Sequence, residues 1–111
     1  MDFNKFSDGL MPAVIQDIET GKVLMLGYMN LEAFNETMSS GKICFFSRSK
    51  GRLWTKGEDS GNFLYLKSYA LDCDQDALVL IVRPAGPACH TGATSCFYRA
   101  LDGDSLIRIG D

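Results

Sequence analysis

Hydrophobic residues along the chain fall into short runs separated by glycine, proline and small polar residues, a pattern typical of β-strands. The first two runs predict strands at residues 11–18 and 22–29, joined by a tight turn at residues 19–21. Further strands are expected at residues 43–46, 62–71, 77–82 and 105–109. Turn residues between short strands favour antiparallel pairing.

One segment has helical rather than strand periodicity. Apolar residues recur at helical spacing over residues 31–40, Asn30 is a favourable N-cap, and Gly41 can end the helix in a left-handed conformation. With one principal helix and five to seven strands, the pattern predicts an α+β fold that is mainly β, with a mostly antiparallel sheet.

Composition narrows the range of functions. The chain is one domain of common size, residues 1–111, and its 46% hydrophobic and 23% charged content is ordinary for a globular protein. A net charge of −3 argues against general nucleic-acid binding. No apolar run approaches the ~20 residues of a membrane helix, and the N-terminus lacks the features of a signal peptide. We therefore expect a cytoplasmic protein that binds neither nucleic acid nor membranes.

Three carboxylates alternate with other residues between two apolar segments, at Asp72, Asp74 and Asp76, and Cys73 lies between the first two. Like charges held together repel one another, and a hard divalent cation such as Mg²⁺, Mn²⁺ or Ca²⁺ offsets that repulsion. In an extended strand the carboxylates would share one face and Cys73 the other, whereas in a tight turn they could still surround one ion. An ordinary acidic turn in water is the alternative.

A basic segment follows the strand at 43–46. Four of the eleven Lys and Arg residues lie between positions 48 and 56 with no acid among them: Arg48, Lys50, Arg52 and Lys56. Glycines and small residues are interleaved, so that arginine forks and backbone N–H groups could bind phosphate. Trp54 could stack on a base or belong to the core. The alternative for the whole segment is a solvated, charged loop.

The cysteines suggest a second kind of metal site. Cytoplasmic cysteines stay reduced, although a disulfide framework remains the alternative in another compartment. Cys73, Cys89 and Cys96 are enough thiols for a zinc site with an open fourth position. His90 could be a fourth ligand, a general acid or base, or a hydrogen-bonded loop residue. Cys44, inside an apolar run, is expected to be buried and inert.

Four motifs in this order resemble those of the phosphoribosyl-AMP cyclohydrolases of histidine biosynthesis. They are Ser47-Arg48-Ser49-Lys50, Leu53-Trp54-x-Lys56-Gly57-Glu58-x-Ser60-Gly61-Asn62, Asp72-Cys73-Asp74-x-Asp76-Ala77 and Gly86-Pro87-Ala88-Cys89-His90-Thr91-Gly92-x-x-Ser95-Cys96-Phe97. The resemblance runs from about Leu10 to Arg99. Two departures are mild: Lys50 stands where arginine is usual, and Asp59 where threonine is usual.

The resemblance implies an enzyme that opens the adenine ring of 1-(5-phosphoribosyl)-AMP at the N1–C6 bond, using a zinc-activated water and releasing no ammonia. It implies a homodimer with one zinc ion per subunit, held by Cys73 of one chain and by Cys89 and Cys96 of the other. It also implies that Asp72, Asp74 and Asp76 bind Mg²⁺.

From the same resemblance we expect His90 to be catalytic, moving a proton during ring opening. The expected substrate-binding residues are Arg48, Lys50, Arg52, Trp54, Lys56, Glu58, Ser60 and Gly61. Two alternatives stay open. Another zinc-dependent nucleotide hydrolase or deaminase would be revealed by released ammonia. A phosphate-binding module in which zinc only stabilises the fold would consume no substrate and would unfold without its metal.

Overall fold

A computed structural model describes residues 1–110, and it confirms the predicted fold class: α+β, mainly β, with mostly antiparallel pairing and one helix in that range. The elements in chain order are β1 (Met11–Asp17), β2 (Val23–Met29), α1 (Leu31–Ser40), β3 (Cys44–Ser47), β4 (Arg52–Thr55), β5 (Leu64–Leu71), β6 (Leu78–Pro84), β7 (Arg99–Asp102) and β8 (Ser105–Arg108). The helix of this described part is not long and apolar enough to span a membrane.

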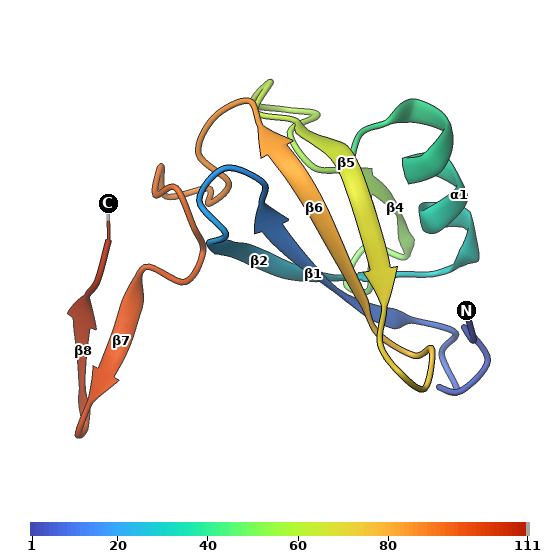
Figure 1. Cartoon of the computed structure of the whole chain (residues 1–111), viewed down its shortest axis with the longest axis horizontal. Coiled ribbons are helices and arrows are strands. Elements are labelled where there is room, and N and C mark those ends of the chain that lie inside the picture. The colour runs from blue at the N-terminus through green and yellow to red at the C-terminus, as the bar shows by residue number, and fades with distance from the viewer. Residues whose placement is uncertain (111) are drawn as a thin grey trace.

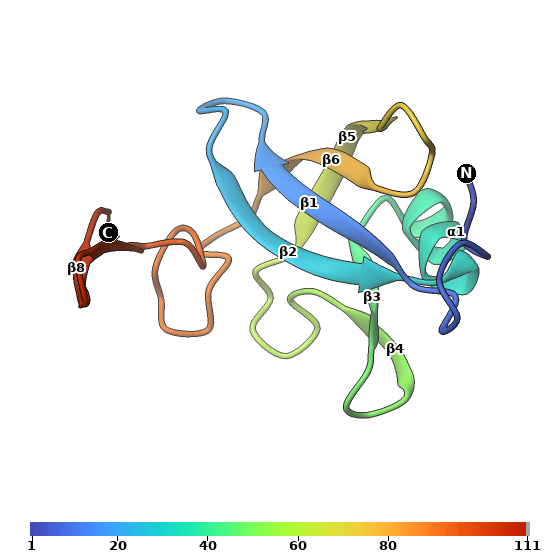
Figure 2. The ribbon, with the colours of Figure 1, turned by 90° about the horizontal axis from the view of Figure 1, so that it is seen from below.

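A four-stranded sheet in the order β2-β1-β6-β5 forms the centre of the molecule. The β1–β2 and β5–β6 pairs are antiparallel, whereas β1 and β6 run parallel. One face of the sheet packs against α1 and the β3–β4 hairpin (Figures 1 and 2). The core on this face includes Met11, Ala13, Ile15, Leu24, Met29, Ile43, Phe45, Leu64, Leu80 and Val82.

Local sequence signals define α1, and its predicted bounds are confirmed. The Asn30 side chain accepts a hydrogen bond from the Ala33 N–H at 2.8 Å, and Gly41 ends the helix at φ 75°. The buried Thr37 hydroxyl donates to Ala33 O at 2.9 Å and accepts from the Cys44 N–H at 2.9 Å. This hydroxyl therefore ties the helix to the start of β3.

Two strands were missed by the sequence patterns. β4 lies inside the basic segment, where the sequence predicts no strand, and pairs antiparallel with β3 across a turn at Gly51, φ 64°. β7 precedes the expected strand near residue 105 and pairs with it as β8. Both strands are only four residues long, and neither shows a clear alternation of apolar and polar residues, so their pairing rather than their composition defines them.

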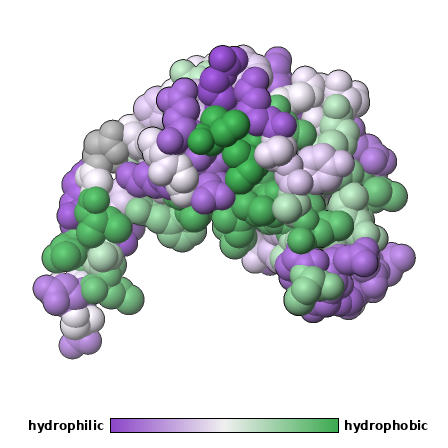
Figure 3. All heavy atoms as spheres, in the orientation of Figure 1, coloured by the Kyte–Doolittle hydropathy of each residue, from purple (hydrophilic) through white to green (hydrophobic). Residues whose placement is uncertain are grey.

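The other face of the central sheet is apolar, and no element among residues 1–110 covers it. Leu26, Val14, Val79 and Ala70 are aligned by strand pairing into one row across all four strands. Leu26 is 44% exposed. Figure 3 shows hydrophobic side chains gathered over the middle of this face. We call the face that carries this row the open sheet face. Solvated sheet faces are usually polar, so an apolar face that is left uncovered is unusual.

A second uncovered apolar surface is the C-terminal hairpin. β7 and β8 pair only with each other and project away from the sheet (Figure 1). Leu101 and Leu106, which are opposite one another in the hairpin, are 77% and 55% exposed. An isolated two-stranded hairpin is at best marginally stable in water. Its exposed leucines form an apolar surface that no other element among residues 1–110 covers.

Candidate active site

A pocket of about 320 Å³ lies between the loop that follows β4 and the segment that follows β6. It brings together many of the predicted functional residues. Its lining includes Trp54, Lys56, Glu58, Ser60, Cys89 and His90. The structure therefore places the predicted catalytic histidine, one predicted zinc-binding thiol and half of the predicted substrate-binding residues around one cavity.

The loop on one side of the pocket depends on Gly57. This glycine has φ 93°, and a Cβ atom there would lie 2.6 Å from the carbonyl carbon and oxygen of Asn62. The Gly61 N–H donates back to Gly57 O at 2.7 Å and closes the loop. Only glycine allows this close approach of two backbone segments. Asn62, which also lines the pocket, was not among the predicted site residues, although it lies within one of the sequence motifs.

The segment on the other side of the pocket is anchored to β2. The Cys96 N–H donates to Leu24 O at 2.7 Å, and the buried Ser95 hydroxyl donates to Val23 O at 2.7 Å. The Cys89 N–H donates to Ala93 O at 3.2 Å and folds the segment back on itself. As a result the thiols of Cys89 and Cys96 lie close enough to influence each other's pKa.

This pair of thiols is suited to a soft metal ion. The Thr91 hydroxyl donates to Cys89 Sγ at 3.0 Å and, with Cys96 and Lys56 acting in the same direction, lowers the pKa of the Cys89 thiol. Desolvation and the nearby Cys89 raise the pKa of the Cys96 thiol, so the first proton leaves Cys89. Thiolates are the form that binds zinc. Thr91 was missed as a contributor, although its position two residues after Cys89 is a local signal.

The remaining cysteines lie elsewhere. Cys44 is buried in the core, as predicted, and burial raises the pKa of its thiol. Cys73 is exposed in the β5–β6 turn, at the opposite end of β6 from Cys89. β6 has seven residues and so spans about 23 Å. Within residues 1–110, no third Cys, His, Asp or Glu completes a metal-binding set with Cys89 and Cys96.

The acidic residues at 72–76 form a tight turn rather than an extended strand. Asp72, Asp74 and Asp76 each place one carboxylate oxygen within 4.8 Å of the others. Asp72 Oδ1 accepts from the N–H groups of Asp76 and Ala77, at 3.0 and 3.1 Å. Three carboxylate oxygens at this spacing fit a hard divalent cation such as Mg²⁺. We call residues 72–76 the acidic turn.

The carboxylates of the acidic turn influence one another. Desolvation acts upward on the pKa of Asp72, but hydrogen bonds led by that from the Asp76 N–H outweigh it and lower this pKa. The neighbouring Asp74 carboxylate raises the pKa of Asp76, and desolvation and Asp72 add to this effect. The three carboxylates therefore repel one another, and a bound cation would reduce this repulsion.

One cation from a distant part of the chain already lies against the acidic turn. The Lys5 ammonium is 3.6 Å from Asp74 Oδ2 and 3.5 Å from Asp76 Oδ2. Desolvation acts downward on the pKa of Lys5, but the two carboxylates outweigh it and raise this pKa. Sequence reasoning missed Lys5, because no local pattern links residues about 70 positions apart.

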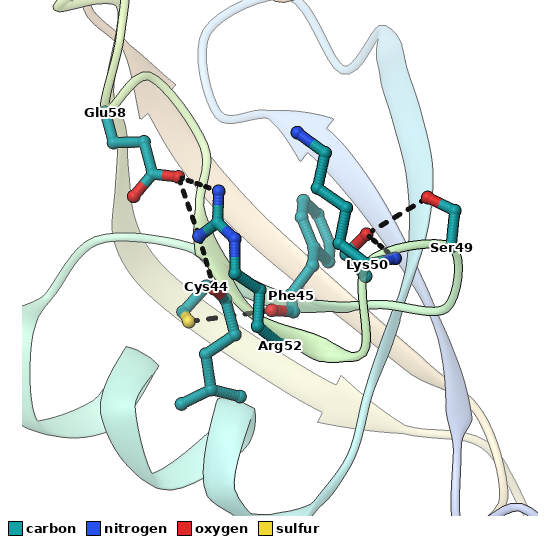
Figure 4. A network of polar contacts seen from close by, with 8 residues as sticks. Cys44, Phe45, Ser49, Lys50, Arg52 and Glu58 are labelled. Atoms are coloured by element: carbon teal, nitrogen blue, oxygen red, sulfur yellow. Dashed lines mark hydrogen bonds and ion pairs between the residues drawn. The ribbon is translucent and has the colours of Figure 1, made fainter.

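The rest of the predicted substrate-binding residues lie outside the pocket. Arg52 faces Glu58, with its terminal guanidinium nitrogens 3.4 Å from Oε1 (Figure 4). Lys50 lines a small hollow with Arg52, and Arg48 lies in another hollow with its guanidinium 4.1 Å from the centre of the Tyr28 ring. Gly61 does not line the pocket, but its N–H holds the adjoining loop closed.

Comparison with known proteins links this arrangement to one family. Residues 25–98 match the sequence model of the family described as phosphoribosyl-AMP cyclohydrolase. The chain is 59% identical over 97 residues to the histidine biosynthesis bifunctional protein HisIE of Bacteroides thetaiotaomicron, covering 87% of this chain and 47% of that protein. It is 58% identical over 97 residues to the protein of the same name from Escherichia coli K12, with the same coverage. The chain thus spans about half the length of the curated relatives it matches.

The close backbone approach at Gly57 leads to a prediction about the pocket loop. Gly57→Ala should destabilise the protein clearly more than Gly51→Ala. Both glycines have positive φ, for which alanine costs about 1 kcal/mol, but only at Gly57 would the new Cβ meet backbone atoms. Urea unfolding of both variants measures the difference. Equal losses of stability would show that the loop accommodates a Cβ and that Gly57 does not define the pocket wall.

Proposed function

Because the chain belongs to the phosphoribosyl-AMP cyclohydrolase family, we propose that it hydrolyses the N1–C6 bond of the adenine ring in 1-(5-phosphoribosyl)-AMP, as a step of histidine biosynthesis. The observation that carries the proposal is the pocket in which His90 and Cys89 face Trp54 and Lys56. It combines a proton-transfer group, a thiol suited to bind metal, an aromatic wall and a cation, a set of groups suited to hydrolysis of a phosphorylated purine.

Trp54 and Lys56 are suited to bind the nucleotide. The Trp54 ring packs against Phe45 with ring centres 5.9 Å apart, so its orientation is supported from the core side. The Lys56 ammonium lies 5.4 Å from the centre of the Trp54 ring. A purine stacked on the indole would therefore lie next to a cation that can attract its phosphate. Glu58, which lines the pocket, pairs with Arg52 outside it, so that this guanidinium would be available for a second phosphate.

His90 supplies the proton transfer in the proposed reaction. Water oxygen adds to C6, the N1–C6 bond breaks, and N1 receives a proton, while the amino group on C6 stays in the product. His90 lines the pocket and is exposed to it, which allows its imidazole to reach a ring nitrogen. An imidazole can both take up and release a proton, so His90 can act as general base and general acid in this step.

Two metal ions complete the proposal. Zinc would be held by Cys89 and Cys96 together with Cys73 of a second subunit, and when bound it would lower the pKa of a water molecule to about 7. Mg²⁺ would be held by the three carboxylates of the acidic turn, where it offsets the charge of substrate phosphates. The cytoplasm, where thiols stay reduced, is the compartment that suits these ligands.

The proposed homodimer follows from the separation of the thiols. Cys73 lies at one end of β6 and Cys89 and Cys96 lie at the other, so a second copy is needed to bring three thiols together. The open sheet face and the leucines of the β7–β8 hairpin offer uncovered apolar area for this contact.

The distribution of charged residues also favours a dimer in which Cys73 of one copy meets Cys89 and Cys96 of the other. Beside Cys96, Arg99 and Arg108 lie against the Tyr98 ring, with guanidinium carbons 5.1 and 5.0 Å from its centre. The acidic turn, which carries Cys73, is negatively charged. Bringing Cys73 of one copy to the thiol pair of the other therefore places opposite charges next to each other.

Purified, zinc-loaded protein should change the ultraviolet absorbance of phosphoribosyl-AMP as the purine ring opens, in the presence of Mg²⁺. The change should stop when a chelator is added, and no ammonia should appear. Ammonia release would instead identify a deaminase. The proposal is wrong if the folded protein with bound zinc consumes no substrate and unfolds when the zinc is removed. Zinc would then have a purely structural role.

His90→Ala should lower turnover by about 10²-fold or more, since general acid–base groups contribute roughly that much. Zinc content, measured by metal analysis, should stay at the wild-type level because the thiols are untouched. Loss of zinc would make His90 a ligand, and unchanged turnover would remove it from the proton transfer.

The double variant Leu101→Ser and Leu106→Ser should shift the protein from dimer to monomer in sedimentation velocity. Both side chains are exposed in the single chain, so its circular dichroism should not change. Asp104→Ser, in the same hairpin, is the matched control and should remain dimeric. A double variant that stays fully dimeric would show that the hairpin lies outside the interface.

A further inference from the structure

The N-terminal segment lies against the acidic turn, although the two are about 70 positions apart in sequence. The Asp2 N–H donates to Gln75 O at 2.9 Å, at the tip of the turn. Gln75 has φ 64°, a left-handed conformation that residues other than glycine rarely adopt. The Gln75 N–H donates to Asp72 O at 3.1 Å. Backbone hydrogen bonds on both sides thus hold the turn in an unfavourable conformation that keeps its carboxylates close together.

Lys5 contributes a charge to this contact. Its ammonium group donates to the backbone oxygen of Asp74 at 2.8 Å and lies 3.6 and 3.5 Å from carboxylate oxygens of Asp74 and Asp76. These carboxylates are two of the three that approach within 4.8 Å of one another. The ammonium therefore lies against the same oxygens that a divalent ion at the turn would use.

We propose that Lys5 is a built-in countercation of the acidic turn, which keeps the three carboxylates together without metal and competes with the divalent ion for them. The inference rests on the proposed Mg²⁺ site at this turn. An ammonium and a divalent cation repel each other, so metal binding requires the Lys5 side chain to withdraw. Lys5 thereby sets the metal affinity of the site.

The charge of Lys5 should affect both the metal affinity of the acidic turn and the stability of the metal-free protein. Withdrawing the Lys5 ammonium from carboxylate oxygens 3.5 and 3.6 Å away at a solvent-exposed site opposes metal binding, so removing this charge should strengthen metal binding by about tenfold. The same removal should destabilise the metal-free protein, because the carboxylates then repel one another without a countercation. A purely structural role for Lys5 predicts the opposite metal effect, since a loosened turn would bind metal more weakly.

The test compares Lys5→Met with Lys5→Arg, which keeps the charge, and with Lys22→Met. Lys22 lies in the β1–β2 turn, and because β1 and β6 are parallel this turn is at the far end of the sheet from the acidic turn. Each zinc-loaded protein is titrated with Mn²⁺, and free ion is followed by its electron spin resonance signal. Melting temperatures are measured with and without Mn²⁺.

Lys5→Met should bind Mn²⁺ about tenfold more tightly than wild type. Its melting temperature should be lower than that of wild type without Mn²⁺ and should rise by more when Mn²⁺ is saturating. Lys5→Arg and Lys22→Met should match the wild type. If wild type binds Mn²⁺ and Lys5→Met binds equally or more weakly, the Lys5 inference is wrong and the metal site stands. If no protein binds Mn²⁺, the metal site itself is wrong and the inference fails with it.

Discussion

The length of β6 is the constraint on which the proposed site depends. This strand holds the acidic turn with Cys73 at one end and the pocket with Cys89 at the other, about 23 Å apart. Because β6 is paired on both sides, by β1 and β5, it cannot bend to bring the ends together. One chain can therefore pair two thiols but cannot assemble three. The proposed shared zinc site and the proposed dimer follow from this one separation, and the uncovered apolar surfaces offer area for the contact between copies.

The pocket itself is built by short-range backbone contacts rather than by the sheet. Gly57 allows the loop after β4 to touch the backbone of Asn62, and Ser95 fastens the thiol segment to β2. These contacts anchor the two segments that carry His90, Trp54 and their neighbours. Such anchoring keeps groups in position, which suits the proposed proton transfer from His90 to a ring nitrogen.

Sequence patterns predicted the features that depend on neighbouring residues. The bounds of α1 followed from Asn30, Gly41 and the apolar spacing between them, and the strands flanking the acidic turn followed from continuous apolar runs. Features that depend on distant residues were missed: β4, which exists through its pairing with β3, and the contact of Lys5 with Asp74. Residue types and motif resemblance indicated the candidate site, but only the fold shows that Arg48 and Lys50 lie outside the pocket that contains Lys56.

Mixing two inactive variants tests the shared site most directly. Cys73→Ser and Cys96→Ser should each lack bound zinc and turnover when pure. After the two are unfolded together and refolded, half of the dimers should be mixed, and each mixed dimer should contain one intact set of three thiols. About a quarter of the wild-type activity and zinc content should therefore return. If the mixture stays as inactive and zinc-free as its parts, although mixed dimers are shown to form, the thiols do not act across the interface and the account is contradicted.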